Sequence, residues 1–209
     1  TEQLVEVPID ERRLEGKLNV PDGASGIVLF AHGSGSSRHS PRNNAVAEVL
    51  REHGLATFLF DLLTEAEDEV RDNRFDIPVL TRRLVTATEW VAEQPQARGL
   101  STGYFGSSTG AAAAMRAAVD DATDVDAIVS RGGRVDMASE VAPALDTPCL
   151  FIVGSEDTQV LELNETVFEQ LTCEKRLAVV EGAGHLFEGP GQLEEVSNLA
   201  AEWFVEHLG

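Results

Sequence analysis

Lysine and cysteine are scarce in this sequence of 209 residues, with two of each. Cys149 and Cys173 lie far apart and do not have the spacing of metal ligands, so we expect both to be reduced and buried. Neither cysteine sits in a glycine-flanked turn, which argues against a catalytic thiol. The only lysines are Lys17 and Lys175, so arginine supplies nearly all of the positive charge.

Basic residues as a whole are also few compared with acidic ones. Thirty-six acidic residues stand against 16 basic ones, a net charge of −20. Such a surface repels phosphate backbones and anionic lipids, so we expect neither nucleic-acid nor membrane partners. Acid excess with few lysines resembles the surfaces of proteins from salt-loving organisms, where salt screens the self-repulsion. The alternative is a solvated acidic surface without a specific role.

Long apolar runs are missing, and none reaches the length that crosses a bilayer. The first residues lack the basic start and apolar core of a signal peptide, so a cytoplasmic protein is expected. No internal repeat or linker is visible, although 43% of residues are hydrophobic and spread along the chain. We therefore expect one globular domain over residues 1–209.

Strand-like and helix-like segments alternate along the chain. Residues 3–9 and 13–20 have the period-2 pattern of an antiparallel hairpin, and Gly26–Gly33 is a continuous apolar run typical of a buried strand. Further strands are expected at 55–61, 101–106, 126–130, 148–154 and 175–182, and helices at 40–54, 77–93, 108–119, 135–145, 160–171 and 192–208. This order predicts an α/β fold with a doubly wound, mostly parallel sheet, in which ligands bind at the carboxyl ends of the strands.

The segment GSSTG contains the candidate nucleophile. Centred on Ser108, it has glycine two positions away on each side, where a strand and a helix nearly collide around an exposed hydroxyl. Centred on Ser107, the same positions would hold Phe105 and Thr109. Ser108 is therefore the predicted nucleophile, and a tight turn without chemistry is the alternative.

Two later loops supply the partners that a serine nucleophile needs. Asp157 directly follows a predicted buried strand and is the candidate acid that orients a histidine, ahead of Glu156 and Asp136. His185 lies in a glycine-bounded loop after the last predicted strand and is the candidate general base. The chain order of serine, acid and histidine is the one expected of this architecture.

Two further groups of residues could contact the substrate. The amides of Thr109 and Ser34, with Gly35 as the next choice, are candidate oxyanion donors, unless the HGSG segment is only a solvated loop. Arg131 and Arg134 are candidate ligands for an anionic substrate group, although pairing with surface acids is the favoured explanation. Asp61 and the stretch Glu65–Glu69 also follow a strand, and a solvated loop accounts for them.

The order of HGSG, GSSTG, GSED and GAGHLF along the chain resembles that of the α/β-hydrolase superfamily, and the compact size resembles its dienelactone-hydrolase-like branch. Dienelactone hydrolases proper have cysteine as nucleophile, where this chain has Ser108, which favours ordinary ester substrates. Only Arg131–Thr147 lie where relatives often carry a lid, so we expect no cap domain and an open, shallow site.

The sequence thus predicts a serine hydrolase that needs no cofactor or metal and cleaves carboxylic esters of small or exposed substrates. A thioesterase or acyltransferase would use the same triad. A non-catalytic binding protein on the same fold is a third alternative, but it would be expected to have lost a triad residue. The sequence does not indicate an oligomeric state.

Overall fold

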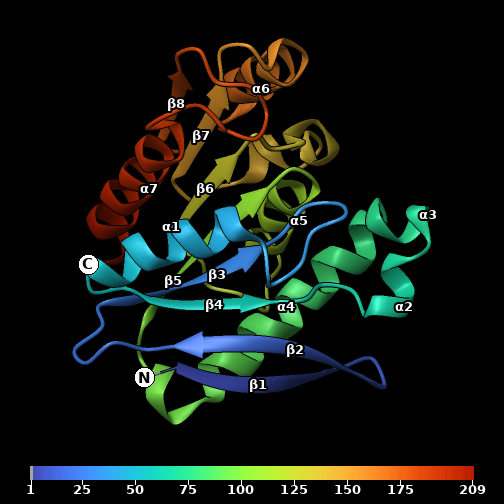
Figure 1. The fold of residues 1–209 in the computed structure, drawn as a ribbon. Helices are drawn as coiled ribbons and strands as arrows, with labels where there is room; N and C mark the ends of the chain where they lie inside the picture. The colour runs from blue at the N-terminus through green and yellow to red at the C-terminus, as the bar shows by residue number, and fades with distance from the viewer. Residues whose placement is uncertain (1) are drawn as a thin grey trace.

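The computed structural model describes residues 2–209 and consists of a single twisted sheet with helices on both faces (Figure 1). The strands are β1 Glu2–Ile9, β2 Arg12–Asn19, β3 Gly26–Ala31, β4 Ala56–Phe60, β5 Ser101–Ser107, β6 Ala127–Arg131, β7 Cys149–Gly154 and β8 Lys175–Val180. They lie in the order β1-β2-β4-β3-β5-β6-β7-β8. The pairs β1–β2 and β2–β4 are antiparallel, and every later pair is parallel. The predicted fold class is confirmed.

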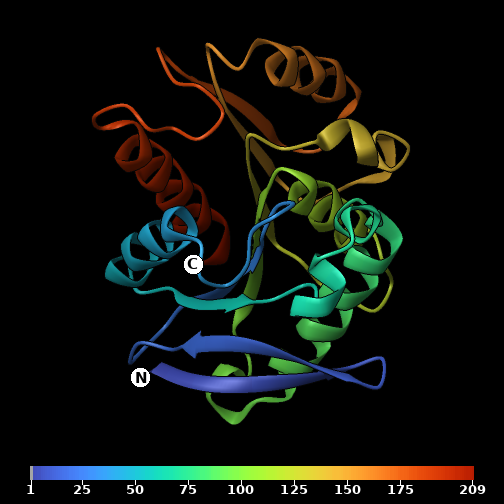
Figure 2. The ribbon, with the colours of Figure 1, turned by 45° about the vertical axis from the view of Figure 1, so that its right-hand side comes forward.

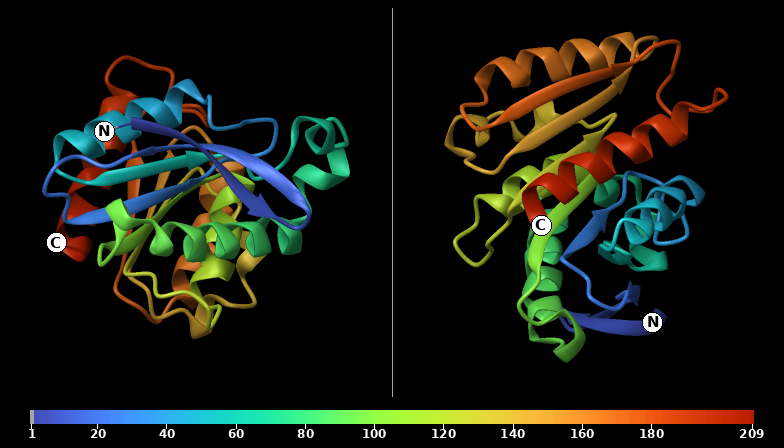
Figure 3. Two further views of the ribbon diagram at one scale, coloured as in Figure 1. Left: turned by 90° about the horizontal axis from the view of Figure 1, so that it is seen from below. Right: turned by 90° about the vertical axis from the view of Figure 1, so that its left-hand side faces the viewer.

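The helices form two layers. They are α1 Pro41–Glu52, α2 Glu65–Asp68, α3 Arg71–Arg74, α4 Ile77–Glu93, α5 Thr109–Ala118, α6 Thr158–Gln170 and α7 Gln192–Leu208, with single 3₁₀ turns η1 Pro95–Ala97, η2 Val135–Ala138 and η3 Ala142–Ala144. Helices α1 and α7 cover one face of the sheet, and α4, α5 and α6 cover the other (Figure 2). The views in Figure 3 show how the strands twist from the hairpin toward β8.

Burial explains why the central strands could be recognised in the sequence. Every residue of β3, β4, β6 and β7 is buried, because helices pack on both faces. Among residues 2–209, no helix combines the length and the apolar character required to cross a bilayer. Because β3 and β5–β8 are parallel, their carboxyl ends lie at one edge of the sheet, which brings together the loops after β3, β5, β7 and β8.

Two expectations about the connections were wrong. The predicted helix at 135–145 consists of two separate 3₁₀ turns, η2 and η3, and residues 132–148 carry no cap. The stretch Glu65–Glu69 is not a solvated loop, because α2 begins there. Thr64 caps this helix through the amide of Glu67, and the Glu67 side chain accepts from the amide of Thr64.

Two acidic side chains of this connection, Glu67 and Asp61, are partnered as well. Glu67 forms two hydrogen bonds with Arg83, each 2.7 Å long, and Arg83 is almost fully buried. These bonds lower the pKa of Glu67 to about 2, although burial by itself would raise it. Asp61 accepts a hydrogen bond from the amide of Arg38 and pairs with the Arg38 guanidinium, so it too belongs to the packed structure.

Candidate active site

Ser108 occupies a sharp turn between β5 and α5. Its backbone has φ = 51° and ψ = −124°, in a region that costs a residue with a side chain about 1–3 kcal/mol. Added Cβ atoms would lie 2.5 Å from Ala111 Cα at Gly106 and 2.0 Å from Ala31 O at Gly110. The two glycines therefore permit the close approach of strand and helix. Ser108 is half-buried at the turn, whereas Ser107 is buried at the end of β5.

Asp157 and His185 lie in contact. Asp157 directly precedes α6, and its Oδ2 is 2.7 Å from His185 Nδ1. This contact selects the tautomer in which Nδ1 carries the proton and Nε2 is the free base. The two loops are further joined by a 2.9 Å bond from the amide of Glu156 to the carbonyl of Ala183.

The rival acids lie elsewhere. The side chain of Glu156 is exposed, and no interaction with His185 is found for it within residues 2–209. Asp136 is bound to Arg134 through two hydrogen bonds of 3.0 Å. The structure thus brings Asp157, and neither alternative, to the candidate base.

Ser108 and His185 line one cavity of about 500 Å³ at the carboxyl ends of the strands. Within the described part of the chain, no hydrogen bond joins Ser108 Oγ to His185 Nε2. Such a bond is often long in a substrate-free enzyme and shortens when substrate binds. Gly132 helps to make room for the imidazole, since a Cβ there would lie 3.1 Å from ring atoms of His185. The sequence reasoning did not identify Gly132, although its place directly after a strand was a signal.

The candidate oxyanion donors lie beside the serine. A Cβ at Gly33 would be 2.8 Å from Ser108 Cβ, so the loop after β3 packs directly on the turn. Ser34 and Gly35 line the cavity, and Thr109 is the first residue of α5. The amides of these three residues donate to no acceptor in residues 2–209. Free amides next to a nucleophile can bind an oxyanion.

The side chain of His32 links the loop after β3 to the loop after β4 through two hydrogen bonds. The amide of Leu62 donates to His32 Nε2 at 2.9 Å, so Nδ1 carries the proton and donates to the carbonyl of Gly33 at 3.0 Å. Burial lowers the pKa of His32, which favours the neutral ring that both bonds require. His32 is therefore a supporting residue of the candidate oxyanion loop.

The two candidate arginines differ sharply. Arg134 pairs with Asp136, as expected for a surface arginine, and its amide donates to the carbonyl of Ser108 at 2.9 Å. Arg131, the last residue of β6, lines the cavity with Ser108 and His185. Burial and the nearby charge of Arg42 lower the pKa of Arg131 to about 10. The expectation that surface acids pair with both arginines is wrong for Arg131.

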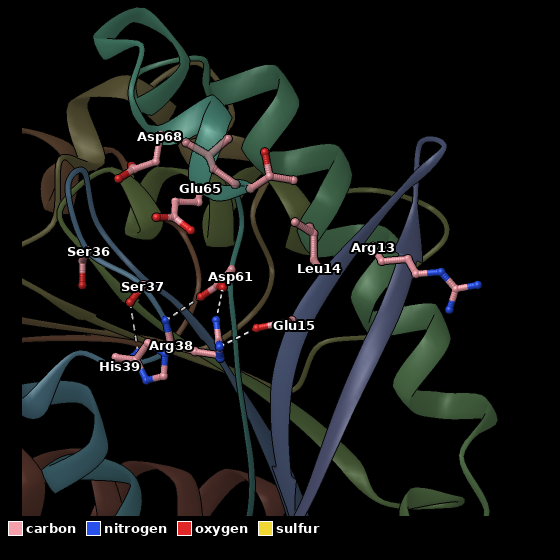
Figure 4. A pocket seen from close by; sticks show the side chains of 12 residues that line it. Arg13, Leu14, Glu15, Ser36, Ser37, Arg38, His39, Asp61, Glu65 and Asp68 are labelled. Carbon is pink, nitrogen blue, oxygen red and sulfur yellow. Dashed lines mark hydrogen bonds and ion pairs between the residues drawn. The ribbon is translucent and has the colours of Figure 1, made fainter.

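A second cavity of about 490 Å³ adjoins the first and shares Ser36, Ser37 and His39 with it. Figure 4 shows Arg38 in this cavity, directed between Asp61 and Glu15. We call it the side cavity, and the one with Ser108 the serine cavity. Two carboxylates match the Arg38 charge, so this half-buried cation of the side cavity is paired within the fold.

Away from both cavities, ligand atoms of Glu174, Glu206 and His207 lie within 4.8 Å of one another. His207 Nε2 is 3.0 Å from Glu174 Oε2, an ion pair that accounts for the grouping when the histidine is protonated. No second observation points to a metal ion at this exposed cluster.

No protein-family model matches the sequence. The chain is 52% identical over 206 residues to the Mycobacterium tuberculosis protein named "Putative phosphoribosyl transferase Rv0571c", a match that covers 99% of this chain and 46% of that protein. The chain therefore spans about half the length of the curated relatives it matches.

Solved structures give matches over the whole length. A dienelactone hydrolase from Anabaena variabilis is 51% identical, with a TM-score of 0.96 over 100% of this chain and 99% of that one. Est1E from Butyrivibrio proteoclasticus is 17% identical and shares the fold, with a TM-score of 0.80 over 97% of this chain and 98% of that one. With the fold and half of all residues shared with the Anabaena protein, this chain belongs to the α/β-hydrolase superfamily, in its compact dienelactone-hydrolase-like branch.

Proposed function

We propose that this chain is a serine hydrolase that cleaves carboxylic esters through an acyl-enzyme intermediate. One observation carries the proposal. The strained Ser108 lines the same cavity as His185, and Nδ1 of His185 is bound to Asp157, which leaves Nε2 as the free base. Strain at a non-glycine residue is retained where the surrounding structure enforces it, most often at functional sites. The fold is shared with proteins named as esterases and hydrolases.

In the proposed reaction, Ser108 Oγ attacks the ester carbonyl while His185 Nε2 accepts its proton. Asp157 keeps the imidazole in the required tautomer and stabilises the imidazolium. The amides of Thr109 and Ser34 bind the oxyanion, each donor being worth about 10²–10³ in rate. His185 then protonates the leaving alcohol and activates the water that releases the acyl group.

The absence of a cap over residues 132–148 supports small or exposed esters as substrates. A lactone is a cyclic ester, so the activity named for the Anabaena protein falls within this class. The phosphoribosyl transferase name describes a protein about twice as long as the matched segment, and we do not transfer that activity to this chain.

The test is hydrolysis of p-nitrophenyl esters of increasing acyl length by the wild type, Ser108→Ala and Ser107→Ala. We expect turnover of the acetate and butyrate esters, and a loss of about 10⁴-fold or more in kcat for Ser108→Ala. Ser107→Ala is the matched control, because Ser107 is the buried neighbour on β5 and should leave kcat within a few-fold. Equal rates for the wild type and Ser108→Ala would overturn the proposal.

A further inference from the structure

The guanidinium of Arg131 is buried and has no partner in the described part of the chain. The residue is 9% exposed, and its Nε and Nη1 are shielded from solvent without a hydrogen bond. Within residues 2–209, Arg131 forms no side-chain hydrogen bond or ion pair. Buried arginines are normally paired, since an uncompensated charge away from water destabilises the folded state. This cost is unexpected in a chain where acids outnumber bases 36 to 16.

The described residues that line the cavity with Arg131 add positive charge and no negative charge. No acidic side chain is among the described residues that line the serine cavity. Arg42 lines it from the first turn of α1, and the positive end of that 12-residue helix points to the same place. Two carboxylates contact residues of this wall, and both are engaged there: Asp157 with His185, and the exposed Glu188 with Arg42.

The rest of the wall can donate hydrogen bonds to an anion. Hydroxyl groups reach the cavity from the loop between β3 and α1, at Ser34, Ser36 and Ser37. The guanidinium fork matches a carboxylate or phosphate with two parallel hydrogen bonds. A buried cation, a helix N-terminus and a wall of hydroxyls together form a site to which residues 2–209 supply no anion.

We propose that Arg131 binds an anionic group of the substrate, a carboxylate or a phosphate, in the cavity where Ser108 attacks the ester. This rests on the proposed hydrolase function and narrows it to esters that carry a negative charge on the acyl or the alcohol part. The bound anion would pair the guanidinium and offset its cost of burial. Arg131 is thus a specificity-determining residue.

Kinetics with matched substrates test this proposal. Mono-p-nitrophenyl glutarate and p-nitrophenyl 4-phosphonobutyrate carry the two anions, and p-nitrophenyl methyl glutarate is the neutral match. For Arg131→Met we expect kcat/KM to fall about 10- to 100-fold for the anionic esters, the loss typical of a charged hydrogen bond, and to stay within threefold for the neutral ester. Arg131→Lys should lie between, because it keeps the charge and loses the fork.

Arg134→Met is the matched control, since Arg134 lies three residues further on and already pairs with Asp136. It should leave the ratio of anionic to neutral kcat/KM unchanged. An equal loss for all three esters in Arg131→Met, or no loss, would overturn the anion site. The anionic ester with the larger loss identifies the natural group as carboxylate or phosphate.

A binding measurement separates this proposal from the hydrolase function. Calorimetric titration of the Ser108→Ala chain with disodium glutarate and with sodium phosphate should show binding of at least one anion. The added Arg131→Met substitution should abolish it, and the added Arg134→Met substitution should retain it. Arg131-dependent binding in this variant, together with no esterase activity in the wild-type chain, would refute the hydrolase function and leave the anion site standing. Esterase activity without anion binding would refute only the anion site.

Discussion

The two neighbouring cavities share a serine-rich wall but differ in whether the arginine of each is paired with an acid. In the side cavity, Arg38 lies between Asp61 and Glu15, and both carboxylates pair with its guanidinium. In the serine cavity, Arg131 is buried and has no partner among residues 2–209, and the amides of Ser34 and of Thr109, next to Ser108, have no acceptor there. The Arg38 cation of the side cavity is thus paired within the fold. The serine cavity, in contrast, has an unpaired cation and free amides that a ligand can bind. Loss of the paired charges next to the first should change stability, and loss of the catalytic or unpaired groups of the second should change reaction rate.

The largest effect among these comparisons is expected at Asp157, the acid that contacts His185. Asp157→Asn should lower kcat for p-nitrophenyl butyrate by about 10³–10⁴-fold, because the amide favours the wrong imidazole tautomer. Asp136→Asn is the control, since Asp136 pairs with Arg134 outside the cavity, and it should stay within a few-fold. A similar loss in both variants would show that Asp157 has no special relation to His185.

A smaller effect, on stability alone, is expected at Glu67 of α2, the helix whose first and last residues line the side cavity. Glu67→Gln removes the charge that pairs with the buried Arg83, so at pH 7 it should lower the unfolding midpoint by about 2–8 °C with kcat unchanged. Arg12→Gln removes the longer, exposed pair of the same carboxylate and should change the midpoint far less.

The pH dependence follows from the pKa of Glu67, which is lowered from 4.5 in the unfolded chain to about 2 in the folded one. Its contribution is complete above pH 4.5 and is lost as pH falls through 2. The difference in unfolding midpoint between the wild type and Glu67→Gln should therefore shrink as the pH falls from 4.5 toward 2. A gap that stays constant down to pH 2 would contradict the pairing.

The smallest effect for each charge, and the most distributed, concerns the acidic surface. If the net charge of −20 reflects adaptation to salt, the thermal midpoint should rise from low to molar KCl as self-repulsion is screened. The measurement is thermal unfolding across a KCl series, with sucrose of matched osmolality as control. A midpoint independent of KCl would contradict salt adaptation.

The sequence predicted the layers of the fold well. Continuous apolar runs identified strands buried on both faces, and α4 and α7 begin and end where the pattern predicted, at Ile77–Glu93 and Gln192–Leu208. Those segments bury residues with a regular period, which is the signal that a sequence carries most clearly. Glycine spacing likewise predicted the close packing around Ser108, because backbone collisions depend on local neighbours.

Interactions between distant segments were not predictable in this way. Helix α2 is short and has no buried residue, so only its capping pair, Thr64 and Glu67, could have identified it. The segment SRGGRVD does not distinguish Arg131 from Arg134. One lies at the end of a buried strand and the other near an acid two residues away, and only the fold shows which guanidinium is left unpaired.

The most direct test of the central claim is labelling of the intact chain with a fluorophosphonate probe, followed by mass spectrometry to locate the adduct. The proposed mechanism predicts one adduct at Ser108, retained in Ser107→Ala and absent from Ser108→Ala. Because the probe requires an activated serine, labelling should also fall sharply in His185→Ala. Absence of labelling at Ser108, or equal labelling of Ser108→Ala, would contradict the assignment of the serine cavity as the active site.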